Sequence, residues 1–203
     1  MIVALIGIMG VGVLTTAQTY SSKDLLTWMQ SSNFGYQVLQ QALNDNQSSS
    51  AAEASCLAEV RLLLTGAEAK SLPALRVFDA WGKFPQGLLY GHFMDMGNYE
   101  SCLSLDLSKS LGNVMTINAG AKYCLSRMQF ESLLMEAAGA DALTLSIGTC
   151  IPSSCSAAQL SRWMSGHLKD MFGQNSTEAT LVQEKDCSLA HRDPMNGLDW
   201  LAV

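Results

Sequence analysis

The sequence predicts an α+β domain in which several helices pack on a small, mainly antiparallel sheet that disulfides stabilise. Apolar residues recur at spacings of three and four in several segments, as on the buried face of an amphipathic helix. In the middle of the chain the period shortens to two, which is typical of half-buried strands. The chain also has 6 cysteines, and an even number in an exported protein favours three disulfides.

The predicted helices are residues 24–44, 51–69, 72–80 and 156–172. The first has a break around Asn33–Gly35. Pro73 fits the first turn of the third, where its missing N–H has no helical partner to lose. The fourth has the clearest signals, because Ser156 and Gln159 form a capping-box pattern and Gly173 supplies a stop.

The predicted strands are residues 103–108, 121–128, 143–147 and 179–185. In the first and third, leucine or isoleucine alternates with a polar residue, so one face of each is expected to be buried. The second and fourth fit as partner strands from their composition. Four cysteines fall at or just beyond these strand ends, where they would staple the sheet: Cys102, Cys124, Cys150 and Cys187.

The full cysteine set is Cys56, Cys102, Cys124, Cys150, Cys155 and Cys187. We expect three structural disulfides, and the sequence leaves their pairing open. A metal site is the weaker alternative, because there is no CxxC pair and the histidines His92, His167 and His191 stand far from the cysteines. We therefore expect no metal and no cofactor.

The N-terminus predicts export. Ile2–Leu14 is apolar and uncharged but short for a bilayer span, so residues 1–17 are expected to be a signal peptide that is cleaved before Gln18. No Lys or Arg precedes Lys23, which leaves an uncleaved anchor as the alternative. Glycosylation is expected at two sequons in polar loops, Asn46 and Asn175.

The rest of the chain has the size of one ordinary domain. We expect a helical segment and polar linker at 18–50, the main domain at 51–190 and a C-terminal tail at 191–203. The chain has 18 acidic residues against 12 basic ones, and the basic residues are scattered. Nucleic acid and anionic membrane surfaces are therefore excluded as expected partners.

The segment Asp79–Gly91 combines glycines with aromatic side chains. Its glycines and Pro85 disfavour a helix, so we expect an ordered loop. Trp81, Phe84 and Tyr90 have enough apolar area to anchor this loop to a core. The alternative is that they contact a ligand.

The sequence contains no recognisable catalytic motif: GxSxG, HExxH, the P-loop and CxxC are all absent. A cysteine nucleophile with a histidine base would require a free thiol, which an oxidised framework removes. We therefore assign no catalytic residue and expect the protein not to be an enzyme.

Four motifs together resemble one known family: Asp79–Gly91, Gly97–Cys102, Lys122–Leu125 and Cys150–Ser156. They are similar to the N-terminal domain of the nose-resistant-to-fluoxetine family, over about residues 56–187. The resemblance implies an extracellular module that in many members precedes a multi-pass membrane acyltransferase domain. It also implies a link to the movement of lipids and lipophilic drugs across epithelia. The end at Gly197–Val203 would fit a chain truncated before such a membrane domain.

Residues and resemblance together predict a secreted, non-enzymatic module that binds a lipid or another lipophilic ligand. We expect an apolar groove near Trp81–Tyr90 and the helix at 156–172. The alternative is a structural or regulatory ectodomain whose partner is a membrane acyltransferase domain. A secreted thiol enzyme, the third class, would need a free cysteine.

Overall fold

The computed structural model describes residues 33–44, 50–84, 87, 90–107, 120–130, 143–172 and 180–190. The expected signal peptide, both sequons and the C-terminal tail lie outside these residues. The described helices are α2 (Phe34–Asn44), α3 (Ala51–Glu68), α4 (Leu72–Ala80), α5 (Tyr99–Leu103) and α7 (Ala157–Phe172). The described strands are β1 (Met94–Asp95), β2 (Ala121–Phe130), β3 (Leu143–Pro152), β4 (Thr180–Leu181) and β5 (Cys187–Leu189). This confirms the expected α+β class.

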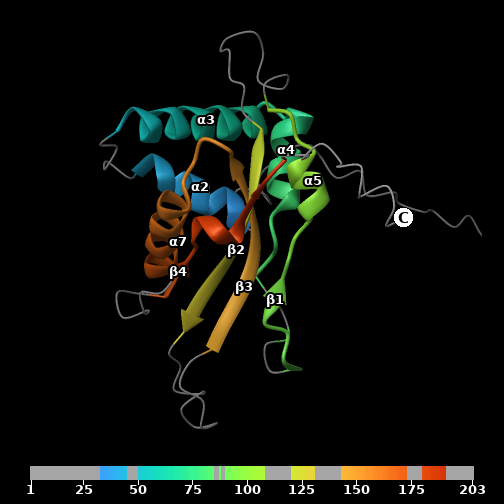
Figure 1. The fold of residues 1–203 in the computed structure, drawn as a ribbon, viewed down its shortest axis with the longest axis vertical. Coiled ribbons are helices and arrows are strands. Elements are labelled where there is room, and N and C mark those ends of the chain that lie inside the picture. The colour runs from blue at the N-terminus through green and yellow to red at the C-terminus, as the bar shows by residue number, and fades with distance from the viewer. Residues whose placement is uncertain are drawn as a thin grey trace, which may run out of the picture.

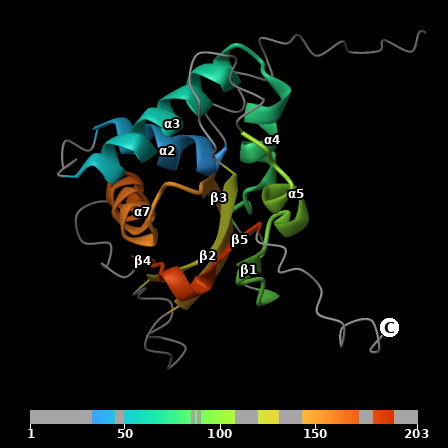
Figure 2. The same cartoon turned by 45° about the horizontal axis from the view of Figure 1, so that its top comes forward.

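The centre of the sheet is the long antiparallel pair β2–β3, in register from Ala121↔Pro152 to Phe130↔Leu143. β4 and β5 both pair antiparallel with β2, whereas β1 pairs parallel with β3. The sheet is therefore mixed but mainly antiparallel. Figure 1 shows helices around one end of the β2–β3 pair, which extends away from them. Figure 2 shows α2, α3 and α7 together on the side opposite β1.

Side-chain caps mark the starts of α2 and α7, whereas Ser71 before α4 makes no side-chain cap hydrogen bond. Asn33 accepts a hydrogen bond from the Tyr36 amide (2.9 Å), so the predicted break in the first segment is the start of α2. At α7 the Gln159 amide donates to Ser156 Oγ (3.2 Å) and the Ser156 amide donates back to Gln159 Oε1 (2.9 Å), which is a capping box.

The predicted strand at 103–108 is wrong. Leu103 is the last residue of α5, a short helix that Asn98 starts by accepting a hydrogen bond from the Ser101 amide (2.9 Å). Leu105 and Leu107 are buried, but the only pairing of this stretch among the described residues is an isolated bridge between Asp106 and Gly120. The alternating leucines therefore belong to a loop whose apolar side chains are buried. An alternating pattern can arise from such burial without a strand.

The segment predicted as a strand at 179–185 is only partly one. β4 covers Thr180–Leu181, and a single 3-10 turn follows at Glu184–Asp186 before β5 begins. The turn's acidic side chains point back to the sheet, because Asp186 pairs with Arg127 of β2 (3.1 Å). Two short strands thus replace the single one expected.

All 6 cysteines are paired, as expected. The bridges are Cys56–Cys155, Cys102–Cys150 and Cys124–Cys187, with sequence separations of 99, 48 and 63. They join α3 to the start of α7, α5 to β3, and β2 to β5. Most of these cysteines lie inside elements rather than at strand ends, so they fasten helices and strands to one another.

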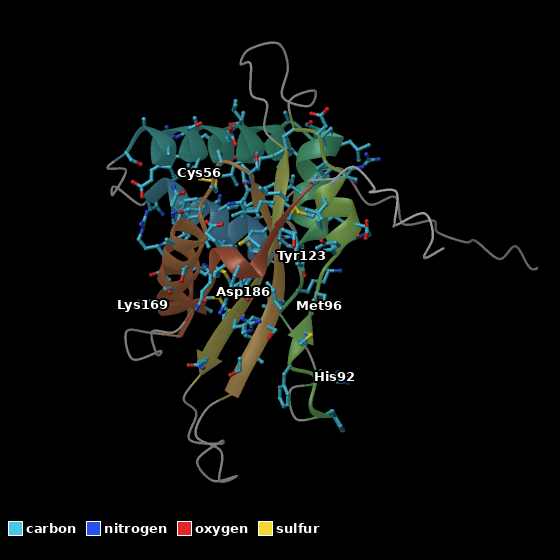
Figure 3. The ribbon with its side chains drawn as sticks, viewed as in Figure 1. Cys56, His92, Met96, Tyr123, Lys169 and Asp186 are labelled. Carbon is cyan, nitrogen blue, oxygen red and sulfur yellow. A yellow bond between two sulfur atoms is a disulfide. The ribbon has the colours of Figure 1, made fainter. Side chains whose placement is uncertain are left out.

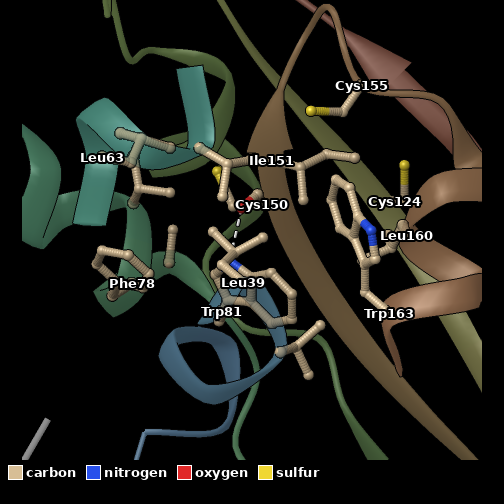
Figure 4. Packing of buried hydrophobic residues seen from close by; sticks show 14 of the residues in the cluster. Leu39, Leu63, Phe78, Trp81, Cys124, Cys150, Ile151, Cys155, Leu160 and Trp163 are labelled. Atoms are coloured by element: carbon tan, nitrogen blue, oxygen red, sulfur yellow. Dashed lines mark hydrogen bonds between the residues drawn. The ribbon is translucent and has the colours of Figure 1, made fainter. Parts of the chain in front are cut away.

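One core unites these elements. Figure 4 shows part of it, including Leu39 of α2, Ile151 of β3 and Trp163 of α7, and each of these side chains is buried. The boundary expected at residue 51 therefore separates α2 and α3, two helices that share a core. No helix in the described part of the chain combines the length and apolarity that crossing a membrane requires.

Candidate functional site

The first half of the glycine- and aromatic-rich loop is an anchor. Trp81 is buried, and its indole Nε1 donates to the Cys150 carbonyl of β3 (2.5 Å), as the dashed line in Figure 4 marks. The Phe34 ring lies edge-on to Trp81 and to Phe84, with ring centroids 6.4 and 6.2 Å away. Phe84 is partly buried against the same core. The aromatic groups thus fix the loop to both the sheet and α2.

Tyr90, the third aromatic residue named from the sequence, is not an anchor. Its side chain is 88% exposed. Its amide, like that of His92, donates to the Gly87 carbonyl, and Gly87 and Gly91 both have positive φ, which favours glycine. The loop therefore has a buried first half and an exposed second half.

The exposed half begins a dense apolar surface. We use the name apolar edge for five side chains that are each more than a third exposed: Tyr90, Phe93, Met94, Met96 and Tyr99. The described residues hold 9 large hydrophobic side chains of that exposure, and these five fall within a span of ten residues. Scattered exposed hydrophobic side chains need no explanation, whereas five in one short segment make that segment a candidate interaction surface.

Its position in the sheet explains the exposure. β1 is the terminal strand in the order β1-β3-β2-β4, so one of its sides has no neighbouring strand among the described residues. Figure 3 shows His92 and Met96 along this edge, with Tyr123 of β2 near its upper end. Sequence reasoning missed Phe93, Met94 and Met96. The available signal was a short run of large apolar residues enclosed by Gly91 and Gly97.

The backbone of the apolar edge is held tightly. The Asn98 amide donates to the Ala80 carbonyl (2.9 Å) and the Gly82 amide donates to the Gly148 carbonyl (2.7 Å). A Cβ on Gly148 would collide with the Met96 carbonyl, and a Cβ on Gly97, whose φ is 58°, would collide with the backbone at Ala80. The surface is therefore preorganised, which lowers the entropy cost of binding.

Tyr123 of β2 also contacts the segment that forms the apolar edge. Its hydroxyl donates to the Met96 carbonyl (2.9 Å) and its ring meets that of Tyr99 at a centroid distance of 4.9 Å. Burial, with smaller contributions from Tyr99 and Asp95, raises the pKa of the Tyr123 phenol. The phenol therefore stays protonated near neutral pH and acts as a hydrogen-bond donor.

The charges near the apolar edge are acidic. Between Tyr90 and Glu100 there is no Lys or Arg, while Asp95 and Glu100 carry carboxylates. Asp95 Oδ1 already accepts the Gly97 amide (2.9 Å). A surface of this composition suits an apolar or neutral ligand rather than an anion.

α7 does not join the apolar edge. Its stripe of Leu160, Trp163, Met164 and Leu168 is buried in the core. Both views place α7 on the side of the β2–β3 pair opposite β1. The helix at 156–172 meets only the buried first half of the loop at Trp81–Tyr90, through Phe34, which contacts His167 as well as Trp81 and Phe84. The five side chains of the apolar edge follow the exposed half of the loop, and α7 contributes none of them.

The buried charged groups have structural partners. Ser154 donates to Glu59 Oε2 (2.6 Å), and burial raises the pKa of the Glu59 carboxyl despite this hydrogen bond. Lys122 donates to the Cys155 carbonyl (2.8 Å) and pairs with Glu184 (3.2 Å). In the described part of the chain no three His, Cys, Asp or Glu side chains gather as metal ligands would.

Comparison with known proteins gives one match. The family model described as "Nose resistant-to-fluoxetine protein, N-terminal domain" matches residues 56–164, which is 109 of 203 residues. The matched span contains the apolar edge and every cysteine except Cys187. No curated protein and no solved structure matches the chain.

Proposed function

Because this chain belongs to the nose resistant-to-fluoxetine N-terminal domain family, we propose that it is a secreted, non-enzymatic module that binds lipids or other lipophilic molecules outside the cell. Its binding surface is the apolar edge. Transport of lipophilic molecules in the extracellular space or across an epithelium would use such a module. Three disulfides support the extracellular assignment, because disulfides persist in oxidising compartments.

The observation that carries the proposal is the concentration of exposed Tyr, Phe and Met side chains in the segment Tyr90–Tyr99, which includes the edge strand β1. Each 100 Å² of apolar surface removed from water contributes about 2.5 kcal/mol. A lipid chain that covers part of this surface would therefore gain several kcal/mol of apolar contact, from which the entropy cost of association is subtracted. Methionine side chains adapt to ligands of different shape, which favours weak selectivity.

The chemistry of the remaining residues supports a binding role over catalysis. Every cysteine is in a disulfide, so the thiol-enzyme alternative lacks its nucleophile. The buried side chains of Glu59 and Lys122 and the exposed side chain of Glu184 bind backbone or side-chain groups near the start of α7. These polar groups therefore have a structural role.

The proposal is tested with the purified, disulfide-intact protein and a fluorescent lysophosphatidylcholine, which has no net charge, as probe. The double variant Phe93→Ser/Met94→Ser should weaken binding of the probe at least about tenfold, because it removes about 1.4 kcal/mol or more of apolar contact. The matched control is Leu72→Ser, which replaces a side chain that is 58% exposed but lies on α4. Equal binding by the double variant, or equal loss in the control, would refute the assignment of the site.

A second function is favoured by the rigidity of the same surface. In a longer polypeptide the apolar edge would contact a membrane acyltransferase domain, and the module would be a structural or regulatory ectodomain. In that case the purified module binds no fatty acid or lysophospholipid, and the Phe93→Ser/Met94→Ser variant instead loses co-purification with a co-expressed acyltransferase domain.

A further inference from the structure

We propose that His167 makes the support of the apolar edge sensitive to acid: protonation of its imidazole loosens the contact among α2, α7 and the loop at Trp81. The ring of His167 lies against that of Phe34, with a centroid distance of 5.5 Å. Phe34 in turn contacts Trp81 and Phe84. One aromatic cluster therefore joins α7, the start of α2 and the first half of the loop.

The surroundings of the His167 imidazole disfavour its protonated form. Nε2 of His167 is buried and has no hydrogen-bond partner among the described residues. In the neutral ring with hydrogen on Nδ1, this atom carries only a lone pair, which an apolar neighbourhood tolerates. Protonation would give Nε2 an N–H without an acceptor and would put a charge beside the Phe34 ring, and both changes cost free energy in a buried site.

The surrounding charges offer little compensation. α2, which packs against α7, contains no charged residue, and neither does β4. The loop carries Lys83, whose side chain is exposed, and α7 carries Lys169 and Asp170 close to the histidine in sequence. Asp170 favours the protonated ring, but burial outweighs it and lowers the pKa of His167 below 6.5.

The effect of acid on stability has a definite sign. A pKa that is lower in the folded state than in the unfolded chain means that the unfolded chain binds the proton more readily. The stability that the neutral ring contributes is therefore complete above pH 6.5 and is lost as the pH falls towards the folded-state pKa. Glu59 has the opposite sign, because its raised pKa means that its contribution is complete below 4.5 and lost as the pH rises. A variant of His167 itself is thus needed to separate the two.

Movement in the aromatic cluster can reach the apolar edge through the backbone next to Trp81. Ala80 precedes Trp81 and accepts the Asn98 amide, while Trp81 itself holds the Cys150 carbonyl. Displacement of Trp81 would therefore disturb the base of the apolar edge at Gly97–Asn98. This last step rests on the proposed function, and it predicts weaker ligand binding in acid.

The first test needs no ligand. The melting temperature of the disulfide-intact protein is measured at about pH 7.5 and about pH 5, on either side of the ordinary histidine pKa of about 6.5. His167→Leu should remove most of the drop that the native protein shows, whereas His92→Gln, a change at an exposed histidine, should keep it. The same drop in native protein and His167→Leu would overturn the proposal.

Two further measurements keep the result interpretable. If His167→Leu does not fold, hydrogen exchange of the native protein replaces it: in acid, the hydrogen-bonded amides of Tyr36, Gln37 and Gly82 should lose protection before those of β2–β3. A uniform loss of protection across all of these amides would contradict a local effect of His167. Binding of the same lysophosphatidylcholine probe at both pH values then separates the two ideas, since no binding at either pH refutes the proposed function alone, and pH-independent binding refutes the coupling alone.

Discussion

Trp81 is the residue on which most of the local organisation depends. Its indole reaches β3 by a hydrogen bond, packs against Phe34 of α2 and lies one residue from the backbone that supports Gly97–Asn98. Gly35 leaves space for the indole, because a Cβ there would collide with the Trp81 ring. A single side chain thus connects a helix, the sheet and the apolar edge.

Trp81→Ala should destabilise the protein by about 3–5 kcal/mol, as expected for removal of a large buried aromatic side chain. Loss of secretion should accompany it, because the unfolded fraction rises steeply. Urea unfolding of the purified variant measures the change. Tyr90→Ala is the control in the same loop and should stay within about 0.5 kcal/mol, since its side chain is 88% exposed. A secreted Trp81→Ala of normal stability would show that the indole is dispensable.

At the scale of elements, β1 is attached to β3 and α4 by close backbone contacts. β1 has only two paired residues, too few for its ladder alone to hold it. Glycines let its flanks press against β3 and the end of α4, and the Tyr123 hydroxyl reaches the Met96 carbonyl from β2. The sequence does not show why these positions are glycine. The atoms that exclude a larger side chain belong to residues far away in the chain.

Gly148→Ala tests this attachment. The added methyl group would collide with the Met96 carbonyl and the Tyr123 hydroxyl, so we expect a loss of about 1–3 kcal/mol and weaker binding of lipophilic probes at the apolar edge. Gly120→Ala provides the control, because a Cβ there meets no atom within 4 Å. Thermal unfolding and probe titration of both variants measure the difference. Similar behaviour of the two would mean that β1 can move aside without cost.

At the scale of the whole molecule, three disulfides join α3 to the start of α7, α5 to β3, and β2 to β5. In a chain-entropy account, closing loops of this length contributes about 4 kcal/mol for each bridge. Two of them end at the segment Cys150–Cys155, so the end of β3 and the start of α7 are fixed to α5 and α3. The third fixes β5 to β2.

Peptide mapping of the secreted protein should find these three linkages and no free thiol before reduction. Reduction should then expose all 6 cysteines to alkylation. The same sample gives its N-terminus, which we expect at Gln18. A native free thiol would reopen the thiol-enzyme alternative, and a cell-retained product that begins at Met1 would show that residues 1–17 act as an anchor.

The sequence by itself determined the local features of this protein. The break near Asn33 and the capping box of Ser156 and Gln159 followed from the sequence, because capping involves residues only three positions apart. The paired state of the cysteines and the family followed from counts and short motifs. The helix α4 began at its predicted place for the same reason, since Pro73 acts on its own turn.

Only the tertiary structure decided which cysteine pairs with which, that Leu103 ends a helix, and that Tyr90 is exposed whereas Trp81 is buried. It also brought Phe93, Met94 and Met96 to an open sheet edge and set His167 against Phe34. These outcomes depend on contacts between residues far apart in the chain. A leucine or tyrosine has the same local signature whether the surface it meets is core, solvent or a partner.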